Sequence, residues 1–160
     1  MSTRATLCLF LLISLSLAGC GEQPRVIQRP GEAKITITGG NDPNIEAATK
    51  EARKTLPQFV KALQHPTPSQ SRFQVKALFH DTFTAEDMWL QHLKYDGTQF
   101  TGELVNNPYQ IQGYQKGNTV SVAAKEIVDW AYRDGDKIQG AYTESALNAE
   151  DKAAATAKPG

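Results

Sequence analysis

Hydrophobic residues recur at steps of three and four positions after residue 42, and this period predicts an amphipathic helix. The apolar stripe is made of Ile45, Ala48, Ala52, Leu56, Phe59, Val60 and Leu63. Asp42-Pro43 is typical of a helix start, because Asp can accept hydrogen bonds from free N–H groups and Pro fits the first turn. Pro57 interrupts the stripe, so we expect the helix either to kink there or to end near Lys54 and restart with Thr55 as its cap.

From residue 72 the apolar positions alternate with polar ones, which predicts strands. Asp96-Gly97 and Asp134-Gly135 are typical of tight hairpin turns. The expected strands are Phe73–Phe79, Met88–Tyr95, Gln99–Val105, Thr119–Ala123, Ile127–Tyr132 and Lys137–Tyr142. The order indicates an α+β fold, in which an N-terminal amphipathic helix is followed by a strongly bent antiparallel sheet or small open barrel of about six strands.

The first twenty residues have the layout of a bacterial lipoprotein signal. Arg4 supplies positive charge, and Leu7–Leu17 is an apolar run too short for a membrane-spanning helix, which needs about 20 residues. The run ends in a lipobox-like pattern, Leu17, Ala18, Gly19 and Cys20. In lipoproteins of this kind the cysteine sulfur is lipidated and cleavage falls between the equivalents of Gly19 and Cys20. We therefore expect residues 1–19 to be a signal peptide; the alternative is an ordinary signal peptide with an accidental cysteine.

This signal sets the expected organisation of the rest of the chain. Residues 20–41 are rich in Gly, Pro, Gln and charge, which favours a lipidated Cys20 followed by a tether, with a short edge strand around Ile35 and Ile37. Residues 42–147 form the expected single globular domain, and residues 148–160 a frayed helix or flexible tail.

The expected location is the cell envelope, with the protein held at a membrane by its N-terminal lipid. Gly21 follows the cysteine. An Asp at that position commonly signals retention in the inner membrane. We therefore expect the outer membrane, facing the periplasm, if the host is Gram-negative.

Composition mainly excludes functions. The 160 residues contain 17 Lys+Arg and 17 Asp+Glu, and this neutral balance argues against a nucleic-acid partner. The cysteines, Cys8 and Cys20, fall in the signal and at the lipid, which excludes disulfides, Cys-ligated zinc and a Cys nucleophile from the mature domain. His65, His80 and His92 lack metal-site spacing, and phosphate-binding glycine motifs are missing, so we expect no metal and no cofactor.

Two carboxylates are weak catalytic candidates. Glu103 and Asp129 lie in different expected strands, and they would share a hydrolytic site if those strands were neighbours. The alternative, which the sequence favours, is that Asp129 accepts hydrogen bonds from loop backbone and fixes a turn.

The long connection at residues 106–118 is a candidate partner-binding loop. It contains two Tyr, three Asn and three Gln with little charge, a composition that suits recognition surfaces. The candidate contact residues are Asn106, Asn107, Tyr109 and Tyr114. The alternative is a plain loop, or a short strand around Ile111. Alanine at Tyr109 and Tyr114 is expected to weaken partner capture while leaving the melting temperature nearly unchanged.

Several segments, in this order, resemble a bacterial family. They are Thr55-Leu56-x-x-Phe59, Phe73-x-Val75-Lys76-Ala77, Met88-Trp89-Leu90, Phe100-x-Gly102-x-Leu104-x-Asn106-x-Pro108, Ile127-x-Asp129-Trp130-x-Tyr132 and Gly140-x-Tyr142-Thr143. Over about residues 52–147 the chain is similar to the YegJ-like family, domain of unknown function 2314. The resemblance implies a small envelope or secreted protein, often a lipoprotein. The family has no established activity, so it supplies no catalytic residues.

Three functions are open at this point. The first is a non-catalytic interaction module, lipid-anchored in the periplasm, that binds an envelope protein or a cell-wall partner. The second is an envelope hydrolase using Glu103 and Asp129. The third is an immunity-type inhibitor of a toxin delivered to the periplasm.

Overall fold

The computed structural model describes residues 25–27, 35–37 and 42–156. The lipobox positions Leu17, Ala18, Gly19 and Cys20 lie outside the described residues. The helices and strands are β1 (Arg25–Ile27), β2 (Ile35–Ile37), α1 (Pro43–Gln64), β3 (Gln70–His80), β4 (Ala85–Tyr95), β5 (Gln99–Leu104), β6 (Thr119–Ala123), the short 3-10 turn η1 (Ala124–Glu126), β7 (Ile127–Asp134), β8 (Lys137–Gly140) and α2 (Tyr142–Thr156).

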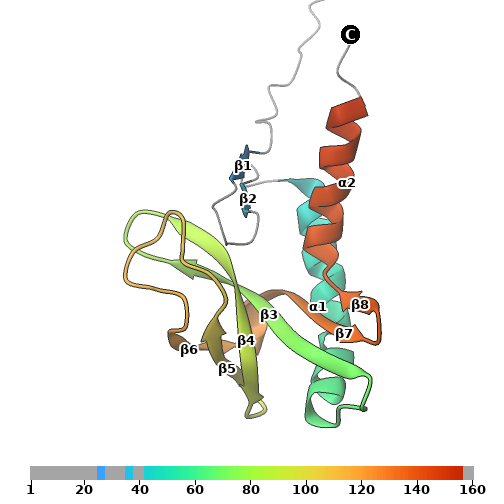
Figure 1. Cartoon of the computed structure of the whole chain (residues 1–160). Helices are drawn as coiled ribbons and strands as arrows, with labels where there is room; N and C mark the ends of the chain where they lie inside the picture. The colour runs from blue at the N-terminus through green and yellow to red at the C-terminus, as the bar shows by residue number, and fades with distance from the viewer. Residues whose placement is uncertain (1–24, 28–34, 38–41, 157–160) are drawn as a thin grey trace, which may run out of the picture.

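Six strands form one antiparallel sheet within residues 42–156, in the order β6-β5-β4-β3-β7-β8. The sheet is not closed, so the predicted α+β fold with an open sheet is confirmed (Figure 1). The predicted short strand at Ile35–Ile37 is present as β2, which pairs with β1 in a separate two-stranded sheet.

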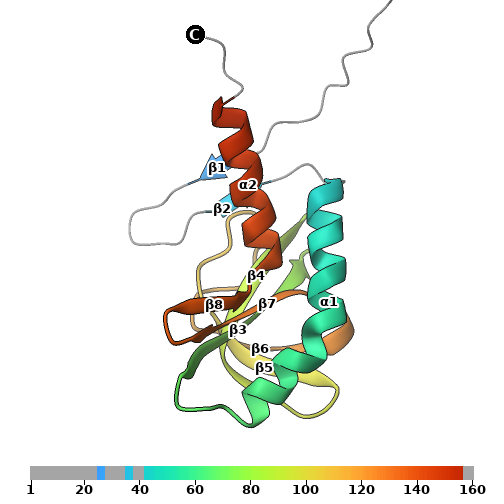
Figure 2. The same cartoon turned by 90° about the vertical axis from the view of Figure 1, so that its right-hand side faces the viewer.

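Helix α1 packs across one face of the sheet (Figures 1 and 2). Its two buried side chains are Ala52 and Phe59. The Phe59 ring lies 5.4 Å from the ring of Trp130, whose indole N–H donates to the Ala52 carbonyl at 2.9 Å. The remaining core is supplied mainly by alternate residues of β3, β4, β5 and β7, among them Val75, Ala77, Met88, Leu90, Phe100, Leu104 and Ile127. Burial of these apolar groups holds the helix on the sheet.

Helix α1 continues through Pro57 as one element, so it does not end near Lys54. Thr55 does not act as a cap; its hydroxyl donates back to the carbonyls of Glu51 and Ala52. The side chain of Pro57 is exposed on the helix surface. A proline in a helix removes one backbone hydrogen bond, and the packed apolar face outweighs that cost here.

The C-terminal part of the chain differs from the expectation. Tyr142 begins helix α2 instead of ending a strand, because Gly140 and Ala141 both adopt a left-handed backbone that terminates β8. A Cβ on Gly140 would lie 2.5 Å from the Trp130 ring, so this position requires glycine. Helix α2 runs beside the first part of α1 and extends to Thr156, over most of the stretch that we expected as a frayed helix or tail (Figure 2).

Candidate functional site

The two carboxylate candidates do not share a site. Glu103 lies on β5 and Asp129 on β7, and β4 and β3 separate these strands in the sheet. Three strand spacings of about 4.8 Å place the two strands about 14 Å apart. Paired glycosidase carboxylates lie within roughly 9.5 Å of each other. The condition on which the hydrolase hypothesis depended, neighbouring strands, is therefore not met.

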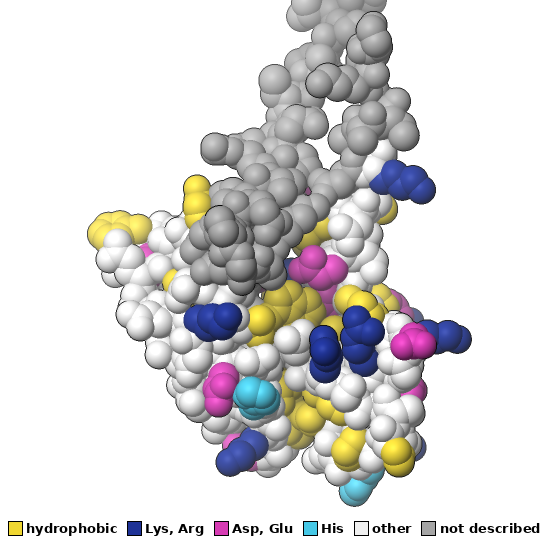
Figure 3. Space-filling model, in the orientation of Figure 1, with side chains coloured by type: hydrophobic (Ala, Val, Ile, Leu, Met, Phe, Trp, Pro, Cys, Tyr) yellow, Lys and Arg dark blue, Asp and Glu magenta, His cyan; other side chains and the backbone are white. Residues whose placement is uncertain are grey.

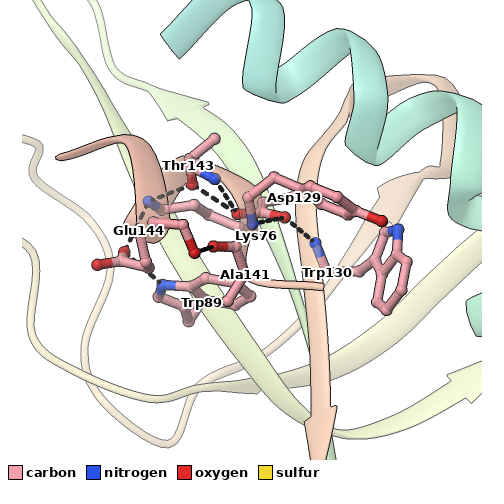
Figure 4. A network of polar contacts seen from close by, with 9 residues as sticks. Lys76, Trp89, Asp129, Trp130, Ala141, Thr143 and Glu144 are labelled. Atoms are coloured by element: carbon pink, nitrogen blue, oxygen red, sulfur yellow. Dashed lines mark hydrogen bonds and ion pairs between the residues drawn. The ribbon is translucent and has the colours of Figure 1, made fainter. Parts of the chain in front are cut away.

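Asp129 belongs to a buried polar network at the start of α2 (Figure 4). Its carboxylate accepts hydrogen bonds from the backbone N–H groups of Trp130, Tyr142 and Thr143, at 2.8, 3.2 and 2.8 Å. It also accepts from the Thr143 hydroxyl at 2.6 Å. Burial raises the pKa of Asp129, and these four donors oppose that rise. This arrangement matches the alternative stated from the sequence, in which Asp129 fixes a turn.

Lys76 completes the network from β3. Its ammonium donates to the Thr143 hydroxyl at 3.2 Å and to the Glu144 carboxylate at 3.0 Å, and it lies 5.4 Å from the centre of the Trp89 ring (Figure 4). The Trp89 indole N–H reaches the same Glu144 oxygen at 3.4 Å. Lys76, Asp129 and Glu144 each have a hydrogen-bond partner within the cluster, so the network attaches α2 to the sheet.

The 106–118 loop is fixed to the neighbouring β3–β4 hairpin. The buried carboxylate of Glu86 accepts from the backbone N–H groups of Tyr109, at 2.7 Å, and Gln110, at 2.9 Å. The Asp81 carboxylate accepts from the Gln112 N–H at 2.9 Å, and the Ile111 side chain is buried in the core. Ile111 lies in no strand, so the loop is ordered by side-chain acceptors.

The four predicted contact residues in this loop have different surroundings. Tyr114 is half-buried and packs edge-on against the Phe79 ring, with 5.4 Å between ring centres. Asn107 accepts from the Lys116 N–H, and Asn106 donates to the Asn107 carbonyl. Tyr109 is 46% exposed. The expectation that alanine at Tyr114 would spare stability is therefore corrected, since its ring packs against the core; partner binding by the four residues stays a prediction.

A different feature stands out at the opposite end of β3 and β4. The two strands pair only from Val75↔Leu90 to His80↔Ala85. Beyond that point they diverge, because residues 70–74 pair with β7 and residues 91–95 pair with β5. Each diverging arm carries a bulge, between Ser71 and Gln74 in the β3–β7 pairing and between Gln91 and Lys94 in the β4–β5 pairing. The divergence opens a cleft between the arms, which we call the bulge cleft.

Both bulges hold a residue in a strained backbone conformation. Arg72 has φ of 54° and His92 has φ of 52°. Residues with a Cβ enter this left-handed region at a cost of roughly 1–2 kcal/mol. Both side chains line the bulge cleft. Strain that is retained at a surface cavity, on both of its walls, is a marker of functional sites.

The bulge cleft has a volume of about 640 Å³ and combines an apolar floor with polar walls. The lining apolar side chains are Leu63, Phe73, Leu93, Ala131, Tyr132 and Ile138, and the polar ones are Arg72, Gln74, Gln91, His92 and Arg133. Figure 3 shows hydrophobic surface exposed in a hollow of this face, with basic side chains along one side. Within residues 42–156 neither arginine has an ion-pair partner, whereas His92 contacts Glu103 at 3.0 Å.

Sequence reasoning missed the bulge cleft, although one signal of it was present. In β4 the inward positions run Met88, Leu90, Leu93 and Tyr95, so the period of two slips by one residue beside His92. Such a slip is the pattern of a β-bulge. No comparable slip marks Arg72 in β3, where Phe73 and Val75 keep the alternation.

Two features are absent from the described residues. In 42–156, no group of three or more His, Cys, Asp or Glu side chains is placed to hold a metal ion. None of the helices described is long and apolar enough to cross a bilayer.

Comparison with known proteins places most of the chain in a sequence family. A family model described as "Uncharacterized protein conserved in bacteria (DUF2314)" matches residues 42–157. The chain is 32% identical over 108 residues to "Uncharacterized protein YegJ" of Escherichia coli (strain K12), an alignment covering 67% of this chain and 69% of that protein. It is 25% identical over 128 residues to a "Putative ankyrin repeat protein" of Neisseria meningitidis serogroup B, of which it spans 51%. No solved structure matches the chain.

Proposed function

This chain belongs to the bacterial DUF2314 family, and from that premise we propose that it is a lipid-anchored binding module of the cell envelope whose ligand enters the bulge cleft. The proposal has two parts, an anchor at the N-terminus and a binding site in the sheet domain. Each part rests on its own observations and can fail separately.

The anchor is supported by the lipobox-like order of Leu17, Ala18, Gly19 and Cys20 after an apolar run. Acyl chains contribute about 0.8 kcal/mol per buried CH₂, so a multiply acylated Cys20 would hold the protein at the membrane without a spanning helix. In a Gram-negative host we place it at the outer membrane, facing the periplasm, because Gly21 replaces the Asp typical of inner-membrane retention.

The bulge cleft is the observation that carries the binding part. It is preformed, about 640 Å³ in volume, and lined by partly exposed apolar groups next to two arginines without an ion-pair partner in residues 42–156. Ligand sites are typically concave, mostly apolar and furnished with a few polar groups that set orientation. The buried Asp129 network has the opposite character, since its charges are already paired.

The binding part is tested by crosslinking in intact cells. A photoreactive amino acid replaces Gln74 or Gln91, one on each wall of the cleft, and the matched control replaces Gln58 on the exposed face of α1. We expect the two cleft positions to capture the same envelope neighbour and the control not to capture it. Identical capture from all three positions, or none from the cleft, would remove the binding proposal.

The anchor is tested independently by Cys20→Ser. The wild type is expected in the membrane fraction, carrying metabolically incorporated palmitate at its N-terminus. The variant is expected to lose the label and the membrane association. A labelled, membrane-bound variant would contradict lipidation at Cys20.

A further inference from the structure

The two arms of the bulge cleft present strand edges that face each other without pairing. The register contains no pair between residues 70–74 and residues 91–95, although both segments are strand. Each arm is paired on its outer side only, with β7 or with β5. The inner edges therefore offer backbone N–H and C=O groups to anything that enters between them.

An extended peptide satisfies such an edge, because its own backbone can continue the ladder. Small ligands without a repeating amide backbone cannot pair along a strand edge. The amide side chains of Gln74 and Gln91, one from each arm, add donors and acceptors that suit the same kind of ligand.

The charges in the cleft select among peptides. Arg72 and Arg133 come from adjacent strands, since Ser71 pairs with Arg133, and both line the cavity without an ion-pair partner in residues 42–156. Guanidinium groups bind carboxylates with paired hydrogen bonds. Glu103, paired with His92, places negative charge beside the opposite arm. A ligand carboxylate is therefore favoured at the β3–β7 wall and disfavoured at the β4–β5 wall.

The apolar floor of the bulge cleft favours a particular kind of ligand side chain next to the carboxylate. Phe73 and Leu93 are half-buried and Ile138 is 61% exposed, so the cleft leaves apolar surface uncovered between its polar walls. An aliphatic side chain next to the carboxylate would cover this surface, which favours binding because apolar surface is removed from water.

Taking the proposed binding function as its starting point, we infer that the bulge cleft binds an extended peptide segment that ends in an aliphatic residue with a free carboxylate. Its backbone pairs with an inner edge of β3 or β4, its carboxylate meets Arg72 and Arg133, and its aliphatic side chain rests on the apolar floor.

The test uses fluorescent hexapeptides with alternating Thr and Val and a C-terminal Leu, titrated against the purified full-length lipidated protein in detergent micelles. We expect the free-acid peptide to bind at least about tenfold more tightly than its C-terminal amide. We expect N-methylation of alternate backbone amides, which removes donors but keeps every side chain, to weaken binding by a similar factor.

Variants locate the effect. Arg72→Gly and Arg133→Gln are each expected to abolish the preference for the free acid over the amide. Lys50→Gln, which removes one positive charge from the exposed surface of α1, is expected to preserve it. Circular dichroism spectra of all variants establish that loss of preference does not reflect unfolding.

Several results would overturn the inference. These are equal binding of acid and amide, no effect of N-methylation, and no binding of any hexapeptide at about 1 mM. Displacement by inorganic phosphate with no peptide preference would mark a general anion site. Binding only after deletion of residues 21–41 would make the chain's own tether the occupant, and self-association blocked by Arg133→Gln would make it a second copy. In each case, crosslinking from Gln74 and Gln91 would still decide the binding proposal separately.

Discussion

Lys76 and Arg72 lie on the same strand, four positions apart, and have opposite environments. The Lys76 side chain is 9% exposed and contacts Thr143, Glu144 and Trp89. Arg72 is exposed, sits in a strained backbone conformation and has no ion-pair partner in residues 42–156. The comparison shows that the paired ammonium of Lys76 helps to hold α2 to the sheet, while two arginines without an ion-pair partner in residues 42–156 line the bulge cleft.

The largest effect is expected in the buried network. Asp129→Ala removes the acceptor of four hydrogen bonds and leaves buried N–H groups of the first turn of α2 unsatisfied. We expect the free energy of unfolding to fall by about 3–5 kcal/mol, measured by urea denaturation. Asp136→Ala, at an exposed turn, is the control and should change it by less than about 0.5 kcal/mol. A small effect of Asp129→Ala would show that the network is not what holds α2.

The second prediction compares two tyrosines in the 106–118 loop. Tyr114→Ala removes a ring packed on Phe79, and we expect a loss of about 2 kcal/mol in the free energy of unfolding. Tyr109→Ala, at a 46% exposed position, should cost clearly less. Thermal unfolding of both variants gives the comparison. Equal losses in the free energy of unfolding would mean that the packed ring of Tyr114 contributes no more to stability than the exposed ring of Tyr109.

The third prediction concerns the strained pair. Arg72→Gly and His92→Gly relieve a left-handed backbone in residues that carry a Cβ, so each is expected to raise the free energy of unfolding by about 0.5–1 kcal/mol. Lys94→Gly, in the same arm as His92 but without positive φ, should lower it by about 0.5–1 kcal/mol.

Chemical denaturation of these three variants measures whether the free energy of unfolding rises or falls in each. Stabilisation that accompanies loss of ligand binding is the expected mark of a residue retained for function at the expense of stability. Destabilisation by Arg72→Gly would instead place Arg72 among the groups that maintain the fold.

The smallest effect is a pH dependence at the hairpin tip. Backbone N–H groups of Phe83, Gln112 and Thr84 hold the pKa of Asp81 below its ordinary value of 3.8. A lowered folded-state pKa contributes stability that is present above pH 3.8 and is lost as pH falls through the folded pKa. We expect Asp81→Asn to make the urea midpoint less dependent on pH between about 2 and 5. An unchanged slope would mean that Asp81 does not stabilise the loop.

Periodicity predicted the strands and α1 because each buries one face, and burial of one face leaves a regular pattern in the sequence. Thr119–Ala123 was predicted with its observed bounds. The start of helix α2 at Tyr142 was not predicted, because it depends on Gly140 and Ala141 in left-handed conformations and on hydrogen bonds accepted by Asp129, which comes from another strand. These are tertiary causes that local pattern does not contain.

The candidate sites could also be predicted only in part from the sequence. Composition identified the 106–118 loop, but the carboxylates that fix it, Glu86 and Asp81, come from a different hairpin. The bulge cleft needs Arg72 and Arg133, far apart in sequence, to meet through the pairing of β3 with β7. A slip in the alternation of β4 could have indicated one wall of the cleft. The positive charge of the other wall depends on the pairing of β3 with β7, which the sequence pattern does not show.

The length of α1 separates the point where the chain enters the domain from the bulge cleft. The chain enters the domain at Asp42, while Leu63, near the other end of the helix, lines the bulge cleft. At about 1.5 Å per residue the helix spans about 30 Å between these points. In a protein held by lipid at Cys20, as we propose, the start of α1 would be the end of the domain nearer the attachment point, and the cleft would lie at the other end. The length of the helix would then add to the length of the tether in setting how far from the bilayer the cleft can reach.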